Sequence, residues 1–206
     1  MTQRRAERED QLLEAALRLF KEKGYHNTSM QDLADALEMQ KGSLYYYIDS
    51  KEELLRRLLG RATSFLTLQI DEIYASDLAP AEKLRWALAN HGETMMEHLD
   101  LVAVYLQEYR NLPPERLKEA LAVRKHYEQV LMQIVQDGIA CGDFRPLNVK
   151  MAVFGVLGML NWTHEWFSPE GEFSAREVAA MLADMALGGL LRREGEVGYR
   201  KQVPDT

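Results

Sequence analysis

Residues 28–51 read TSMQDLADALEMQKGSLYYYIDSK, and the fold is decided by the pattern in this stretch. Its first half carries four apolar residues at the i, i+3, i+4, i+7 spacing of a helix that buries one face: Met30, Leu33, Ala34 and Leu37. Ser29 stands just before this run, and Gln31 or Asp32 can reach back to it as a capping-box partner. The first half is therefore predicted to be a short capped helix.

The second half, residues 41–48, contains three consecutive tyrosines, which taken alone favour a strand. No second strand pattern occurs in the sequence to pair with them, so we interpret this segment as another short helix. On a helical wheel Leu44 and Ile48 point inward. The outward side and its edges carry Lys41, Gly42, Ser43, Tyr45, Tyr46 and Tyr47. Two short helices joined by three or four residues form a helix-turn-helix.

The rest of the sequence also predicts helices, so the expected fold class is all-α. A long helix opens at the capping box Ser50-Lys51-Glu52-Glu53 and continues to about residue 74. Later helices are separated by turn-forming breaks at residues 76–80, 111–115, 141–146 and 168–173. We expect residues 1–50 to form a three-helix helix-turn-helix domain and residues 51–206 a larger C-terminal helical domain, with the helix of about residues 50–74 linking the two.

Composition narrows the function classes. The single cysteine, Cys141, excludes an internal disulfide and favours a reduced, cytoplasmic setting. The N-terminus lacks the apolar segment of a signal peptide, and the longest uncharged run, residues 151–164, is too short to span a membrane. Residues 1–61 hold 11 basic and 11 acidic side chains, so the net charge of −7 belongs to the remainder. Nucleic-acid binding must therefore rest on local pattern rather than on bulk charge.

Residues 28–51 resemble the DNA-binding helix-turn-helix of the tetracycline-repressor (TetR) family, and a nearly all-helical chain of this length also fits that family. The resemblance implies a dimeric transcriptional repressor, not an enzyme, that binds palindromic operator DNA and is released by a small hydrophobic effector. Carried over position by position, it implies DNA contacts at Thr28, Gln40, Lys41, Gly42, Ser43, Tyr45, Tyr46, Tyr47 and Lys51. Tyrosine hydroxyls and lysine amines suit phosphates, whereas Ser43 suits a base edge.

Two positions depart from the family pattern. The turn position that is often glycine is Glu38, and the phenylalanine usual after the tyrosine pair is Ile48. If the backbone of Glu38 needs a positive φ, its side chain costs about 1 kcal/mol. An alternative interpretation makes residues 45–47 core aromatics and the lysines plain surface charges, but it leaves the ordered pattern of the whole segment to chance.

A second stretch, GVLGMLNWTHEWFSPEG at residues 155–171, places two tryptophans one helical turn apart. It is similar to the C-terminal region of TetR-family regulators of fatty-acid degradation, which implies an acyl-CoA effector and control of fatty-acid degradation genes. Together, this stretch and the Met- and Tyr-rich helices before it supply the expected effector contacts. These are Met95, Leu99, Val102, Tyr105, Leu106, Tyr109, Arg110, Tyr127, Asn161, Trp162 and Trp166. A plain aromatic core, and an aromatic acyl-CoA or drug-like effector, remain alternatives.

Small residues recur along the last two predicted helices and allow close helix packing. The resemblance implies a four-helix dimer interface there, with the expected contacts Ala152, Gly155, Gly158, Ala179, Ala183 and Ala186. Packing within one chain is the alternative.

Signals for catalysis or a metal are weak. HGETMMEH at residues 91–98 lacks a repeated Glu-x-x-His pair, and Cys141 lacks a placed base. We therefore expect no catalytic residue, no metal ligand and no cofactor besides the acyl-CoA effector. A helical acyl-CoA-binding enzyme or carrier is the competing class, and it leaves residues 28–51 unexplained.

Overall fold

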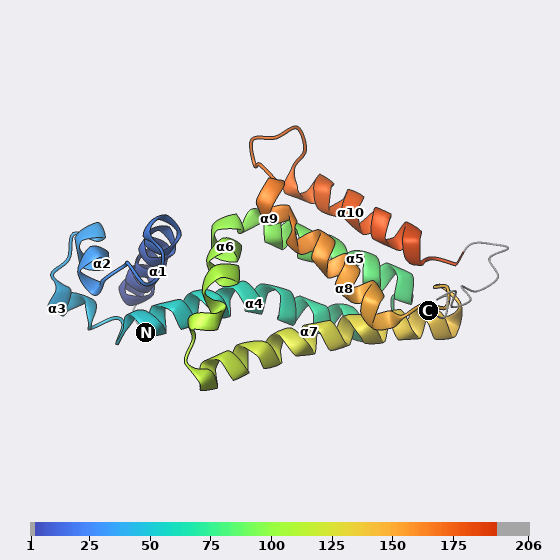
Figure 1. Cartoon of the computed structure of the whole chain (residues 1–206), viewed down its shortest axis with the longest axis horizontal. Helices are drawn as coiled ribbons and strands as arrows, with labels where there is room; N and C mark the ends of the chain where they lie inside the picture. Colours follow the sequence, from blue (N-terminus) through green and yellow to red (C-terminus); the bar gives the residue numbers. More distant parts are fainter. Residues whose placement is uncertain (1–2, 193–206) are drawn as a thin grey trace, which may run out of the picture. The chain divides into compact units, whose positions relative to one another are not determined.

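The computed structural model describes the backbone of residues 3–192, and all side chains among them except those of residues 3–4, 62–66 and 68. The described chain is helical, as predicted, and its only β-pairing is an isolated bridge between Phe144 and Leu191 (Figure 1). The elements are α1 (Gln3–Lys23), α2 (Met30–Ala36), α3 (Lys41–Leu44), α4 (Lys51–Ala75), α5 (Pro80–Glu97), α6 (Leu99–Glu108), the 3₁₀-helix η1 (Tyr109–Asn111), α7 (Pro114–Cys141), α8 (Val149–Asn161), α9 (Thr163–Trp166) and α10 (Ala175–Leu190). None of the helices within residues 3–192 has both the length and the apolar character to cross a membrane.

The chain divides into two compact units, and the division does not follow the boundary expected at residue 50. Unit 1 contains residues 1–65 and 98–124, and unit 2 contains residues 66–97 and 125–206. Helix α6 therefore belongs with the helix-turn-helix. The physical reason is that Leu101, Val104 and Leu112 are buried in the same apolar cluster as side chains of α1, α2, α3 and α4.

In unit 1 the helix ends and caps that were predicted from the sequence are present. Helix α1 ends before Gly24, whose φ of 80° suits a residue without a side chain. The hydroxyl of Ser29 accepts from the backbone N–H of Asp32, and the Asp32 carboxylate accepts from that of Ser29. Of the two capping-box partners considered, Asp32 is the one used. Leu44 and Ile48 are buried, so the outward side of α3 is the predicted one.

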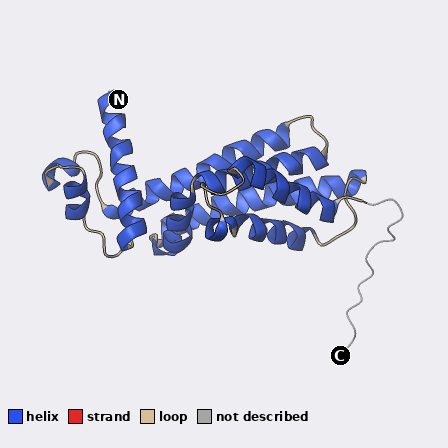
Figure 2. Ribbon diagram, turned by 90° about the horizontal axis from the view of Figure 1, so that it is seen from above, coloured by secondary structure: helices blue, strands red, loops and turns tan. Residues whose placement is uncertain are grey.

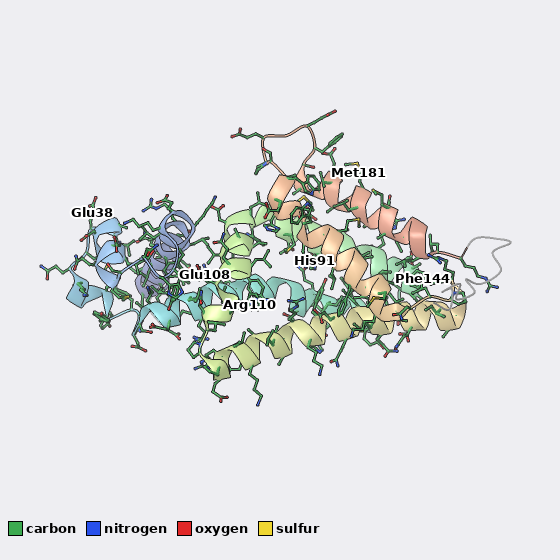
Figure 3. All side chains as sticks on the ribbon, in the orientation of Figure 1. Glu38, His91, Glu108, Arg110, Phe144 and Met181 are labelled. Atoms are coloured by element: carbon green, nitrogen blue, oxygen red, sulfur yellow. The ribbon has the colours of Figure 1, made fainter. Side chains whose placement is uncertain are left out.

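Unit 2 is a helical bundle in which α5, α8 and α10 pack against one another (Figure 1). Helix α10 approaches α5 closely at Gly92, where an added Cβ would lie 3.1 Å from the Cβ of Ala179. Near the end of α7, Gly138 makes room for Phe144 (Figure 3), two of whose ring atoms would lie 2.2 and 2.3 Å from such a Cβ. Both glycines are therefore required by close packing.

Between the predicted breaks at residues 141–146 and 168–173 the sequence indicates one helix, but the structure has two, α8 and α9, separated at Trp162. The side chain of Thr163 donates to the carbonyl of Leu160, and the ring of His164 bonds to the carbonyl of Asn161. These side chains compete with the backbone for the helix's own acceptors, which favours an end to the helix at this point.

Candidate functional site

Helix α3 and the turn that follows it present a polar surface. Gln40, Lys41, Gly42 and Ser43 are exposed, and nothing lies within 4 Å of a Cβ built on Gly42. Tyr45 and Tyr46 are 46% and 69% exposed, and the half-buried Tyr47 meets the Tyr46 ring edge-on at 5.2 Å. Seven of the nine expected DNA contacts are therefore gathered on or beside one short helix.

Lys51, an expected phosphate contact, is instead engaged within unit 1. Its Nζ donates to the carbonyl oxygens of three loop residues: Tyr25 (2.7 Å), Thr28 (2.8 Å) and, more weakly, His26 (3.4 Å). The same nitrogen lies 4.4 Å from the centre of the Tyr25 ring. An ammonium group has three donor hydrogens, and these carbonyls use them. Lys51 therefore stabilises the loop between α1 and α2, and its contact with a phosphate stays a prediction.

Thr28 also departs from its expected role. Its side chain is 1% exposed, and its hydroxyl donates to the carbonyl of Gly24 (2.9 Å), with that of Leu19 at 3.3 Å. A buried hydroxyl that is already satisfied stabilises the loop and has no surface to offer DNA. The expected side-chain contact of Thr28 with DNA is therefore corrected.

Glu38 occupies the turn between α2 and α3 with a φ of 53°, the left-handed conformation in which glycine is favoured. The positive φ considered from the sequence is therefore present, and its strain is a small local cost. The side chain is exposed (Figure 3), so the cost comes from the backbone and not from packing.

Glu108, which the sequence reading missed, holds the loop between α1 and α2 from the end of α6 (Figure 3). This residue is 7% exposed, and its carboxylate accepts from the backbone N–H of Tyr25 (3.3 Å) and from the side-chain amide of Asn111. Burial, with the charges of Glu52 and Glu108, raises the pKa of the Tyr25 hydroxyl to about 12. No local pattern marks a glutamate whose partner lies 83 residues away.

Three expected effector contacts meet at the end of α6 in unit 1. The rings of Tyr105 and Tyr109 stack, with centroids 5.7 Å apart and planes 16° from parallel. The Arg110 guanidinium lies 5.5 Å from the Tyr109 ring, and its Nε donates to the Tyr109 hydroxyl (2.9 Å). Leu99 and Leu106, on the same helix, are half-buried, and Val102 is buried. A planar aromatic pair next to a guanidinium suits a flat or anionic group.

Two further expected contacts meet in unit 2, on a histidine that the sequence reading gave no role. His91 is buried on α5 (Figure 3). Its Nδ1 lies 3.0 Å from the Tyr127 hydroxyl, and its Nε2 lies 2.9 Å from Oδ1 of Asn161. Burial lowers the pKa of His91 to about 4 and raises that of Tyr127. The neutral ring satisfies both bonds when Nε2 carries the proton. Met95, one turn along α5, is also buried.

A void of about 10 Å³ lies between α5, α7, α8 and α10, and only apolar side chains line it. A space of this size holds roughly one water molecule. It is therefore a packing gap in the core.

Trp162 and Trp166 do not form an internal wall. They are 61% and 50% exposed, and the break between α8 and α9 removes the continuous helix that placed them on one face. The helix buries its other side, which carries Val153, Leu157 and Leu160. The role of the two tryptophans as effector contacts stays a prediction.

The expected dimerisation residues fall into two groups. Gly155 and Gly158 lie on the open side of α8, with nothing within 4 Å of an added Cβ. Ala152 and Ala186 are half-buried within the chain. Ala179 and Ala183 are buried in unit 2, so their small size serves packing inside the chain. We correct the prediction for these two alanines.

The open side of α8 is apolar along its whole length, with Met151, Phe154 and the two glycines followed by Trp162. On α10, Met181 and Met185 are also exposed, and Figure 3 marks Met181. A monomeric protein seldom leaves so many large apolar side chains in water, so this surface is typical of an interface.

Two family models match the chain. The model described as "Bacterial regulatory proteins, tetR family" matches residues 12–58. The model described as "Tetracyclin repressor-like, C-terminal domain" matches residues 77–190, more than half of the chain.

Individual proteins are similar over nearly the whole length. The HTH-type transcriptional repressor KstR2 of Mycolicibacterium smegmatis is 28% identical over 194 residues, which cover 93% of this chain and 94% of KstR2. The crystal structure of PfmR, a TetR family transcriptional regulator from Thermus thermophilus, has a TM-score of 0.79 and 38% identity, covering 88% of this chain and 99% of PfmR. The structure of AibR with isovaleryl coenzyme A and operator DNA has a TM-score of 0.75 and 29% identity, covering 89% of this chain and 98% of AibR.

Proposed function

The chain belongs to the TetR family of DNA-binding transcriptional regulators, and from this premise we propose that it is a homodimeric repressor of palindromic operators whose effector is an acyl-CoA. Members of this family are regulators and not enzymes, in agreement with the expectation from the sequence. The observation that carries the proposal is the exposed polar surface of Lys41, Ser43, Tyr45 and Tyr46.

Operator binding uses this surface in two ways. Tyrosine hydroxyls and the Lys41 amine are phosphate partners, which fix the register of the protein on the duplex. Gly42 lets the backbone come close to the groove, and Ser43 and Gln40 supply donors and acceptors for base edges. A helix of four residues reads few base pairs, so specific binding needs two copies of it.

Dimerisation through the open side of α8 and the neighbouring exposed side of α10 supplies the second copy. Covering Met151, Phe154 and Trp162 removes apolar surface from water, and Gly155 and Gly158 allow two helices to approach closely. A two-fold pairing of this kind matches the two-fold symmetry of a palindromic operator.

An acyl-CoA effector is supported by the likeness to AibR, which was solved with isovaleryl coenzyme A. It is also supported by the two groups of expected contacts: Tyr105, Tyr109 and Arg110 in unit 1, and His91, Tyr127 and Asn161 in unit 2. We further propose that the protein controls fatty-acid degradation genes. We also propose that it acts in the cytoplasm.

A gel-shift assay on DNA upstream of the protein's own gene tests the proposal. We expect a retarded band that acyl-CoAs release, with an effect that grows by up to about 4-fold per buried methylene until the pocket is full. Free CoA should do little, because it lacks the apolar part. Absence of a retarded band contradicts operator binding, whereas a band that no short, long or aromatic acyl-CoA changes contradicts only the effector.

Tyr127→Phe sharpens the effector part, because it removes one hydroxyl next to His91. We expect the variant to bind DNA normally and to need more acyl-CoA for release. Tyr74→Phe, which removes a hydroxyl from an exposed tyrosine of the same unit, is the matched control.

A further inference from the structure

The DNA-facing surface of unit 1 includes a cation that lies outside the helix-turn-helix. Of the two expected lysines, Lys41 is exposed, whereas the Nζ of Lys51 donates to loop carbonyls. The guanidinium of Arg5, on the first turn of α1, lies 5.3 Å from the centre of the Tyr46 ring. Tyr46 is the most exposed of the three tyrosines, so Arg5 is at the same surface.

Arg5 is held in this position by an acidic neighbour. Its Nε donates to Oε1 of Glu9 (3.1 Å), and the other oxygen of Glu9 lies 3.4 Å from Nη1 of Arg57 on α4. The bond to Glu9 uses only Nε, and no hydrogen bond within the described residues occupies the two terminal amino groups of Arg5. These groups are the pair that binds phosphate oxygens in a fixed fork geometry.

From these contacts we propose that Arg5 binds a backbone phosphate of the operator next to the one contacted by Tyr46, so that the N-terminal turns of α1 form part of the DNA interface. The inference rests on the proposed operator binding and adds a contact from a different helix. In Figure 2 the N-terminal end of α1 projects away from the helices beside it.

The salt dependence of binding distinguishes a phosphate contact from a structural role. Each phosphate neutralised contributes about −0.9 to the slope of log K against log salt. We expect Arg5→Gln to weaken binding to all sequences alike and to reduce the magnitude of the slope by about 0.9 per chain, or about 1.8 for a dimer. Arg116→Gln, which changes an exposed arginine paired with Glu119 on α7, is the matched control and should leave the slope unchanged.

Removing Arg5 also leaves the charge of Glu9 less compensated, and a second variant separates this effect. Arg5→Gln with Glu9→Gln has the net charge of the wild type. A slope that stays reduced in the double variant supports the phosphate contact, and a slope restored to the wild-type value overturns it. Arg5→Lys should recover most of the slope, because it keeps the charge.

Three outcomes are informative. An unchanged slope for Arg5→Gln in a protein that still binds its operator overturns the inference and leaves the proposed function intact. A reduced slope accompanied by an unchanged thermal midpoint supports it. Failure of the wild type to bind any upstream DNA contradicts the proposed function itself, and the inference with it.

Discussion

Helices α3 and α8 meet solvent with opposite chemistries. Helix α3 has one buried residue, Leu44, and exposes lysine, glycine and serine. Helix α8 buries one apolar side and exposes another, which includes Phe154 and Gly158. A polar surface is stable in water and suits a charged ligand, whereas an exposed apolar side gains free energy only when another apolar surface covers it. In the proposed function these two surfaces have different partners, DNA for α3 and a second chain for α8.

The contrast between exposed and buried apolar surface is tested most strongly by two carboxylates, one on the open side of α8 and one on the buried side of α10. Gly158→Glu lies on the open side, so we expect a folded monomer whose operator affinity falls by about 100-fold or more, because two linked contacts become one. Ala183→Glu lies in the core, so we expect loss of roughly 3–5 kcal/mol of stability. Light scattering measures the mass against the chain's 23.7 kDa, and circular dichroism follows unfolding. A folded, monomeric Ala183→Glu would reverse our assignment of the two sides.

The core of unit 2, where His91 of α5 is buried, should be sensitive to acid. Because burial lowers the pKa of His91 from 6.5 to about 4, the unfolded chain takes up this proton first. The contribution of His91 is therefore complete above pH 6.5 and falls by about 3 kcal/mol as the pH drops to 4. Urea unfolding at pH 7 and pH 4.5 measures this loss in the free energy of unfolding. His91→Gln should lose stability less steeply over this range, and an equal slope would contradict the assignment.

On α3 the expected effect is on binding and not on stability. Tyr45→Ala combined with Tyr46→Ala removes two exposed hydroxyls, and we expect operator affinity to fall by about 10- to 100-fold with little change in the thermal midpoint. Unchanged affinity in a gel shift would mean that α3 meets DNA with other residues. Tyr74→Ala, an exposed tyrosine in unit 2, serves as the control.

The smallest expected effect concerns the turn before α3. Glu38→Gly removes a side chain from a residue with a φ of 53°, so we expect the free energy of unfolding to rise by up to about 1 kcal/mol. Glu38→Ala keeps a Cβ and should show no such gain. Equal stability of the two variants in urea would show that the turn carries no strain.

Sequence pattern predicted the orientation of α3 because Leu44 and Ile48 are apolar among polar neighbours. The same reasoning failed for α8, since a helix that is apolar all round does not show which side is inside. Small size was equally ambiguous: Gly158 is open and Ala183 is buried.

Contacts between residues far apart in the chain could not be predicted from the sequence either. Lys51 and Thr28 sit in a recognisable motif, yet the carbonyl groups that bind Lys51 are set by the path of the loop. Glu108 and His91 carry no local signal at all, because their partners lie far along the chain.

The two hydrogen bonds that hold the backbone of Tyr25 determine which segments of this protein can be exchanged as a unit. The backbone N–H of Tyr25 is bound by Glu108 of α6 and its carbonyl by Lys51 of α4. A chimera that exchanges residues 1–50 for the helix-turn-helix of another regulator removes Tyr25 from both partners. The buried Glu108 carboxylate then keeps only one of its two donors, the side-chain amide of Asn111. A chimera that transfers α6 and the start of α4 together with the helix-turn-helix keeps both hydrogen bonds to Tyr25. For building sensors with new operators, the exchangeable module is therefore discontinuous in sequence.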